Sequence, residues 1–305
     1  MRKTIILALL FCCGFSAYGQ KSDSGISPEG LEQLQQLEDT LGVLGYAIVN
    51  DSLAENRFGA CHQMIKTLVK ALKTPNSFEY PFERMRAVSI LYPQDSSFRI
   101  FTWQLYVDTE EYKYYGAIQM NSEELQLFPL QDRSAELTSL DYEVFGPERW
   151  YGALYYNIRT LNTPDGPQHL LFGFDGYSFF TKRKLIDVLT FQEGKPVFGA
   201  PIFTQGTEES GAIPKNRLVL EYTAETSIRL NYDENMGIII FDHLISMMTP
   251  RGPVMVPDGS YEGFEIENGK LVHVEKLFHQ VSETPPRPQP VLDSKGKRKD
   301  IFGNR

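Results

Sequence analysis

The hydrophobic pattern changes period near Phe82, and this change limits the possible folds more than any other feature of the chain. Before it, apolar residues recur every three or four positions, which is typical of amphipathic helices. After it, short aromatic and β-branched runs alternate with turn residues up to about residue 280, which is typical of antiparallel strands. The pattern therefore predicts two N-terminal helices followed by a mostly β domain.

Both predicted helices have recognisable start signals. Ser27 is a good N-cap for the first helix, whose leucine stripe we expect to end at Gly42 and Gly45. The pair Ser52…Glu55 has the spacing of a capping box and predicts the start of the second helix. The second helix would present one apolar face, formed by Cys61, Met64, Ile65, Leu68, Val69 and Leu72.

The rest of the chain predicts antiparallel meanders that form a β-sandwich-like fold. The dipeptide Asn268-Gly269 between two apolar runs is the strongest hairpin signal. Tyr114 to Ile118 also resembles Trp150 to Leu154, and such an echo keeps a propeller-like fold open as the alternative. The expected strands cover 86–92, 97–107, 112–120, 125–130, 150–159, 169–174, 185–191, 217–222, 227–232, 237–243, 261–267 and 270–277.

The N-terminus predicts export. Arg2 and Lys3 precede an apolar run that ends in Ala17-Tyr18-Gly19, which gives a signal peptide over 1–19. Lipidation at the adjacent cysteines Cys12 and Cys13 is the alternative, and no transmembrane anchor is expected after cleavage. The predicted organisation is a signal peptide over 1–19, a helical segment over 20–81, a β domain over 82–280 and a flexible Pro-rich, basic tail over 281–305.

Composition excludes several classes of function. With 39 acidic against 30 basic residues the chain has a net charge of −9, which is unfavourable for binding nucleic acid. Signal cleavage would leave Cys61 as the single cysteine, so the mature chain needs a hydrophobic core instead of a disulfide. Its histidines share no metal-ligand spacing, and we predict neither a metal site nor a cofactor.

Aromatic residues near an aspartate form the first candidate ligand site. Trp150 and Tyr151 could line a groove for a carbohydrate or a peptide, although aromatic residues in strands are usually core. Phe174 and Asp175 could stack on and hydrogen-bond a sugar. The alternative is that Asp175-Gly176 forms a hairpin turn.

A second candidate is the pair Asp242 and His243. His243 could act as a general base if a carboxylate oriented it, but neighbours on a strand point to opposite faces. Its partner would therefore come from elsewhere, and the alternative is a strand-end histidine bonded to the backbone. Three further acids could act as the acid and base of a glycoside hydrolase, or they could simply lie on the solvent-exposed faces of strands: Glu143, Asp187 and Glu221.

Four loose motifs resemble a group of uncharacterised exported proteins of Bacteroidetes-type bacteria. They are Trp-Tyr-Gly-Ala-Leu at 150–154, Leu-Leu-Phe-Gly-Phe-Asp-Gly at 170–176, Lys-Pro-Val-Phe-Gly at 195–199 and Ile-Phe-Asp-His-Leu at 240–244. The resemblance implies export into a Gram-negative envelope and no particular activity.

The sequence predicts a periplasmic, outer-membrane-associated or secreted binding module for a glycan, a peptide or an envelope protein. None of the common local signatures of hydrolases, metalloproteases or nucleotide-binding enzymes is present, so an enzyme is not favoured. The alternative is a hydrolase whose carboxylates converge from separate strands. An aromatic-lined groove would favour the binding module, and acids within hydrogen-bond reach in a cleft would favour the hydrolase.

Overall fold

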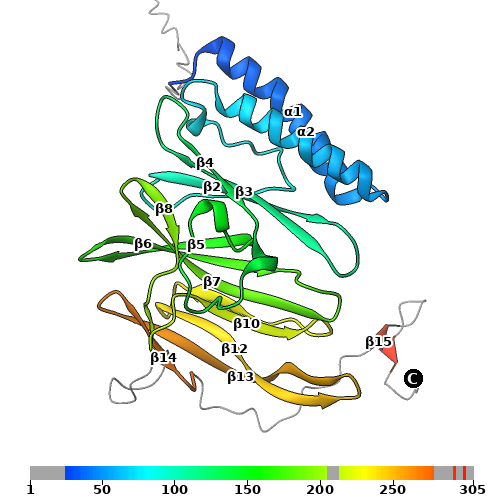
Figure 1. The fold of residues 1–305 in the computed structure, drawn as a ribbon, viewed down its shortest axis with the longest axis vertical. Helices are drawn as coiled ribbons and strands as arrows, with labels where there is room; N and C mark the ends of the chain where they lie inside the picture. Colours follow the sequence, from blue (N-terminus) through cyan, green and yellow to red (C-terminus); the bar gives the residue numbers. More distant parts are fainter. Residues whose placement is uncertain (1–24, 205–212, 278–290, 293–297, 300–305) are drawn as a thin grey trace, which may run out of the picture.

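The computed structural model describes residues 25–204, 213–277, 291–292 and 298–299 of the chain. These residues form layers in Figure 1, with a pair of helices at the top and three larger β-sheets stacked face to face beneath it. The predicted signal peptide and most of the predicted tail lie outside the described residues.

The helix pair consists of α1 (Pro28–Asn50) and α2 (Ala54–Leu72). Ser27 is the N-cap of α1, as predicted, and its hydroxyl accepts a hydrogen bond from the Gly30 amide at 3.1 Å. The predicted apolar face of α2 is confirmed, because most of its members are buried against α1 and the first sheet: Cys61, Met64, Leu68 and Leu72.

Two local predictions about these helices are wrong. Gly42 and Gly45 do not end α1, which continues to Asn50. Gly45 instead allows close packing, because a Cβ there would lie 3.2 Å from that of Ala87. The capping box at Ser52 is not formed either: α2 starts one residue later, without a side-chain cap.

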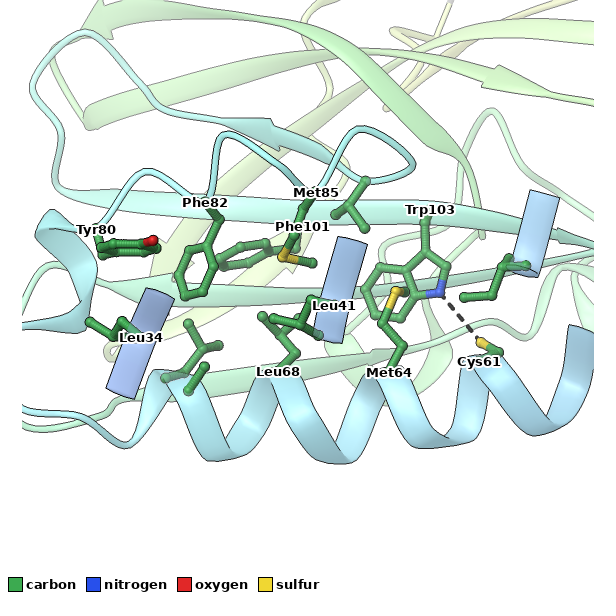
Figure 2. Close-up of a cluster of buried hydrophobic side chains, with 14 of the residues drawn as sticks. Leu34, Leu41, Cys61, Met64, Leu68, Tyr80, Phe82, Met85, Phe101 and Trp103 are labelled. Atoms are coloured by element: carbon green, nitrogen blue, oxygen red, sulfur yellow. Dashed lines mark hydrogen bonds between the residues drawn. The ribbon is translucent and has the colours of Figure 1, made fainter. Parts of the chain in front are cut away.

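The first sheet lies directly under the helices. Trp103 and Met64 lie side by side in the core between the two layers, and the Trp103 indole N–H points to the Cys61 sulfur at 3.4 Å (Figure 2). The strands are antiparallel and lie in chain order: β1 (Ser89–Leu91), β2 (Phe98–Tyr106), β3 (Tyr112–Met120) and β4 (Leu127–Gln131).

The second sheet is the middle β layer. Its strands have the order β10-β7-β6-β5. The short strand β8 pairs with the C-terminal end of β7, on the edge of β7 opposite β6. Both faces are buried, which explains why the sequence of its central strand reads as a continuous apolar run. The strands are β5 (Leu154–Thr163), β6 (Gly166–Asp175), β7 (Thr181–Gln192), β8 (Lys195–Phe198) and β10 (Leu218–Thr223).

The third sheet forms the outermost layer, in the order β11-β12-β13-β14-β9. Asn268-Gly269 forms the predicted hairpin between β13 and β14, and both residues have positive φ. The strands are β9 (Phe203–Thr204), β11 (Leu230–Asp233), β12 (Ile238–Thr249), β13 (Gly252–Glu267) and β14 (Lys270–Val274). The remaining short elements are η1 (Ser77–Glu79), η2 (Ser134–Glu136), η3 (Pro147–Arg149), β15 (Val291–Leu292) and β16 (Arg298–Lys299).

Successive residues of β6 belong to different cores. Leu171 faces the core shared with the first sheet, whereas Leu170 and Phe172 face the core shared with the third. The fold is thus mostly β and sandwich-like with N-terminal helices, as predicted. The sheets stack as layers and are not arranged as blades around an axis, so the propeller-like alternative does not describe the molecule.

Candidate functional site

A cleft of about 650 Å³ opens where the first and second sheets meet. It lies between the start of β3, the segment that follows β4 and the turn that follows β6. Charged groups of both signs line it, among them Glu110, Lys113, Asp132 and Arg183. The cleft also contains five tyrosines: Tyr112, Tyr114, Tyr115, Tyr151 and Tyr177.

Asp175 is the buried carboxylate of the cleft, at the carboxyl end of β6. The Tyr151 hydroxyl donates to its Oδ2, and the backbone N–H of Tyr177 donates to its Oδ1 at 2.8 Å. The Tyr114 hydroxyl is hydrogen-bonded to the same carboxylate. Burial raises the pKa of Asp175, and the three hydrogen bonds oppose this rise.

The two tyrosine hydroxyls bound to Asp175 have further partners. Tyr114 Oη accepts a hydrogen bond from the Gly176 amide at 2.6 Å, and Tyr151 Oη accepts one from Arg183 at 3.3 Å. Burial raises the pKa of both tyrosines well above the ordinary value, so both stay neutral. Asp175 therefore fixes the direction of both hydroxyls, and it joins β3 to the turn after β6.

Two cations of β7 lie beside this cluster. Arg183 pairs with Glu221, with Nη2 2.8 Å from Oε2, and its guanidinium lies 3.4 Å from the centre of the Tyr177 ring. The Lys182 ammonium donates to the Gly176 carbonyl at 2.8 Å, and burial lowers the pKa of Lys182. The cations thus hold the turn after β6 in place.

Two glycines allow the walls of the cleft to approach one another. A Cβ on Gly152 would overlap the carboxylate of Asp132, which accepts a hydrogen bond from the Tyr114 amide at 2.9 Å. A Cβ on Gly176 would lie 2.8 Å from the Tyr112 ring, closer than real contacts allow. Both glycines belong to sequence motifs identified above, and here their role is close packing.

The sequence-predicted aromatic group is divided by the structure. Tyr151 and Asp175 come together in the cleft, but Trp150 is fully buried and offers no surface to a ligand. The Trp150 indole N–H donates to the Tyr155 hydroxyl at 2.9 Å within the core. Phe174 is half-buried on the opposite face of β6 and does not line the cleft.

His243 lies elsewhere, at a bulge where the register of β12 and β13 shifts. Its Nδ1 is 3.0 Å from Asp258 Oδ2 and its Nε2 is 3.5 Å from Glu262 Oε1. The other oxygen of Glu262 is 2.7 Å from Nε2 of His273. The acids near His243 thus come from β13, while Asp242 accepts a hydrogen bond from the Arg229 amide.

The three acids considered for glycoside hydrolysis do not converge, because each pairs with a different arginine. Asp187 and Arg217 form a fully buried ion pair of 2.8 Å. Glu221 binds Arg183 at the cleft. The remaining pair, Glu143 and Arg149, lies at 3.5 Å.

Sequence reasoning did not select Tyr114 or Arg183. The one sequence signal for Tyr114 is the echo between 114–118 and 150–154. Both segments contribute side chains to the core between the first two sheets: Tyr114, Ile118, Trp150, Tyr151, Ala153 and Leu154. Among residues 25–204 and 213–277, no group of three or more His, Cys, Asp or Glu side chains is arranged to hold a metal ion. Within the part of the chain that the structure describes, no helix has the length and apolarity needed to cross a membrane.

Comparison with known proteins identified no relative of the chain. No protein-family model matches the chain, and searches of curated proteins and of solved structures give no significant match.

Proposed function

We propose that this protein is an exported, non-enzymatic binding module whose cleft holds a glycan. The observation that carries the proposal is the tyrosine-lined cleft of about 650 Å³ whose buried carboxylate, Asp175, already has three hydrogen-bond donors. A volume of this order suits a small ligand. The signal peptide predicted from the sequence supports an envelope or secreted location.

The chemistry of the cleft suits a polyhydroxylated ligand. Sugars have apolar C–H faces that pack on aromatic rings. The Tyr177 ring carries the Arg183 guanidinium on one face, and 43% of the residue's surface is exposed for a contact on the other. The hydroxyl groups of sugars both donate and accept hydrogen bonds, so a rim with Lys113, Arg133 and Glu110 can bind them in several orientations.

The engagement of Asp175 argues against hydrolysis. A general acid must bring its proton to the substrate, whereas both oxygens of Asp175 accept hydrogen bonds from groups of the protein itself. A hydrolase is the second candidate because burial raises the pKa of Asp175, as enzymes do for catalytic acids. In our proposal Asp175 orients Tyr114 and Tyr151 and does not react.

Calorimetric titration of the mature chain with glycans and with peptides tests the proposal. The Tyr177→Ala variant removes the exposed ring and should weaken glycan binding about five- to tenfold. Tyr46→Ala is the matched control, because Tyr46 is an exposed tyrosine on α1, and it should bind as the wild type does. Equal binding by both variants would contradict the assignment of the cleft, and binding of peptides alone would replace the glycan as ligand.

The hydrolase alternative has its own measurement. Chromatography of glycans incubated with the protein should show no shorter products if the cleft only binds. Products that appear with the wild type and vanish with Asp175→Asn would establish hydrolysis and overturn the proposal.

A further inference from the structure

The outer half of the β12–β13 hairpin, residues 244–257, is a two-stranded ribbon that extends beyond its neighbours. Strand β11 pairs with β12 only at 238–241, and β14 pairs with β13 only from Gly263 onward. The ribbon begins at the bulge that contains His243. In Figure 1 its strands lie in the bottom layer, coloured yellow and orange.

The ribbon is apolar on both faces, apart from Ser246 and the turn. Residues directly opposite each other in an antiparallel pair share a face, and the faces alternate along the strand. One face carries Ile245, Met247, Val254 and Val256, and the other carries Leu244, Met248, Pro253, Met255 and Pro257.

Both faces have exposed members, although Val254 and Val256 are half-buried and β13 also packs against β10 of the second sheet. Ile245 and Met247 are exposed on one face, Met255 is exposed on the other, and Met248 beside it leaves 77% of its surface free. Exposed antiparallel strands normally have polar residues on at least one face, and strands apolar on both sides are usually buried on both. The pattern therefore indicates that the exposed residues on both faces of the ribbon meet an apolar environment.

The tip of the ribbon combines one cation with aromatic rings. Arg251 is the only charged residue in the sequence 244–257, although the whole chain has a net charge of −9. Its guanidinium lies 4.3 Å from the centre of the Phe180 ring, and Phe179 beside it is also exposed. A cation among exposed apolar groups suits an anionic group at the border of an apolar phase.

The prolines of β13 lower the cost of removing its free edge from water. Pro253 and Pro257 are four residues apart, so their backbone groups point to the same edge of β13. They lie opposite Met248 and Leu244, and neither has a backbone N–H. At these two positions the N–H group of any other residue would point away from β12, towards the free edge of β13. With these donors absent, the edge has fewer groups to hydrate and cannot template another strand efficiently.

We propose that the ribbon inserts into the headgroup region of a phospholipid surface, with Arg251 at the lipid phosphates. A protein groove would cover mainly one face, whereas a lipid surface can contact the exposed residues of both faces, Ile245 and Met247 on one and Met248 and Met255 on the other. The proline-containing edge also disfavours a second copy of the chain that adds a strand there. Shallow insertion keeps the remaining backbone groups of the edges near water.

Flotation of the mature chain with phospholipid vesicles tests the proposal. The wild type should float with vesicles of phosphatidylethanolamine and phosphatidylglycerol, and Met247→Asp/Met248→Asp should reduce the bound fraction about tenfold or more. Val43→Asp is the matched control, because Val43 is an equally exposed apolar residue on α1. Arg251→Glu should weaken binding to these anionic vesicles more than binding to phosphatidylcholine vesicles.

A fluorescence reporter gives a second, independent measurement. Trp103 and Trp150 are buried, so a Met248→Trp variant adds the one solvent-exposed indole among the described residues. Its emission should shift to the blue when vesicles are added. The substituted residues are exposed and contribute little to the core, so the variants should fold, and circular dichroism checks that they do.

Three results would overturn the proposal. One is the absence of flotation with every vesicle composition. Another is an equal loss in Val43→Asp and in the methionine variant, which would remove the ribbon from the interaction. The third is a dimer in the absence of vesicles that Met247→Asp/Met248→Asp dissociates, which would make a second copy the occupant.

Discussion

The dipeptide Asp-Gly occurs at the cleft as Asp175-Gly176 and at the base of the ribbon as Asp258-Gly259, with different physical roles. Asp175 is buried and its pKa is raised, whereas Asp258 is exposed and its pKa is lowered to about 2. Gly176 is required by its contact with the Tyr112 ring. Gly259 has φ of +88° and no atom within 4 Å of its would-be Cβ, so it is required by its backbone conformation.

The local chemistry of the two aspartates is nearly the same. Asp175 accepts from the backbone N–H of Tyr177 at 2.8 Å, and Asp258 accepts from that of Ser260 at 2.9 Å, in each case two residues further on. The pKa values diverge because the first sheet covers Asp175, while side-chain and backbone hydrogen bonds from Ser260 act on Asp258 in the open. The dipeptide therefore accounts for the same local hydrogen bond in both places, and the tertiary neighbours determine the burial and the pKa of each aspartate.

The largest expected effect is that of Asp175→Ala. It would leave the buried donors of Tyr151, Tyr114 and Tyr177 without their acceptor, which should destabilise the protein by roughly 2–3 kcal/mol. In a domain of this size the melting temperature should fall by about 5–10 °C. Asp258→Ala is the comparison variant and should cause a clearly smaller shift, since its donors can turn to water. Equal shifts would remove the distinction between the two sites.

Gly176→Ala should follow, with a loss of about 1–3 kcal/mol in denaturant unfolding, because its Cβ would meet the Tyr112 ring at 2.8 Å. The cause is steric, so replacing the Tyr112 ring with a smaller side chain should restore part of the lost stability. We therefore expect Gly176→Ala/Tyr112→Leu to be more stable than the sum of the single variants predicts. Strict additivity would show that the contact is not the reason for the glycine.

Gly259→Ala should cost about 1 kcal/mol, because a side chain disfavours positive φ. Asparagine tolerates such conformations better than alanine, so Gly259→Asn should lose less in the same unfolding experiment. Shortening a neighbouring side chain should not restore the stability lost in Gly259→Ala, since the space around the Cβ is open. A larger loss for asparagine than for alanine would point to crowding instead of conformation.

The smallest effect is a pair of opposite slopes of stability against pH. The folded protein holds the proton of Asp175 to higher pH than the unfolded chain does, so this group's contribution falls as pH rises above 3.8. For Asp258 the folded pKa of about 2 lies below 3.8, so its contribution is complete above 3.8 and is lost as pH falls towards 2. Urea unfolding between pH 2 and pH 6 should show each slope disappear in Asp175→Asn or Asp258→Asn. Slopes of the same sign would contradict the opposite shifts.

The elements were more predictable than the site. The predicted range 112–120 coincides with β3, and Asn268-Gly269 forms the hairpin between β13 and β14, as predicted. Both signals depend on a few adjacent residues. The extension of β12 and β13 into the ribbon was not predicted, since its sequence lacks the usual alternation of apolar and polar residues.

The candidate site was predicted only in part. Tyr151 and Asp175 were selected separately, one as a possible groove residue and one as an acid among aromatics, and the structure joins them. The sequence also left open that acids on different strands converge, but each of these acids pairs with its own arginine, which the sequence did not indicate. Pairing of that kind depends on sheet order, which local sequence patterns do not encode.

The sequence by itself determined the presence of two helices, most of the strands, the Ser27 cap and the β13–β14 turn, because each depends on preferences within a few residues. The tertiary structure alone decided which aspartate is buried and where the cleft opens. The hydrogen bond between Tyr114 and Gly176 joins residues 62 positions apart. Contacts over such separations form only when whole sheets stack, since the burial of apolar faces then brings distant polar groups together.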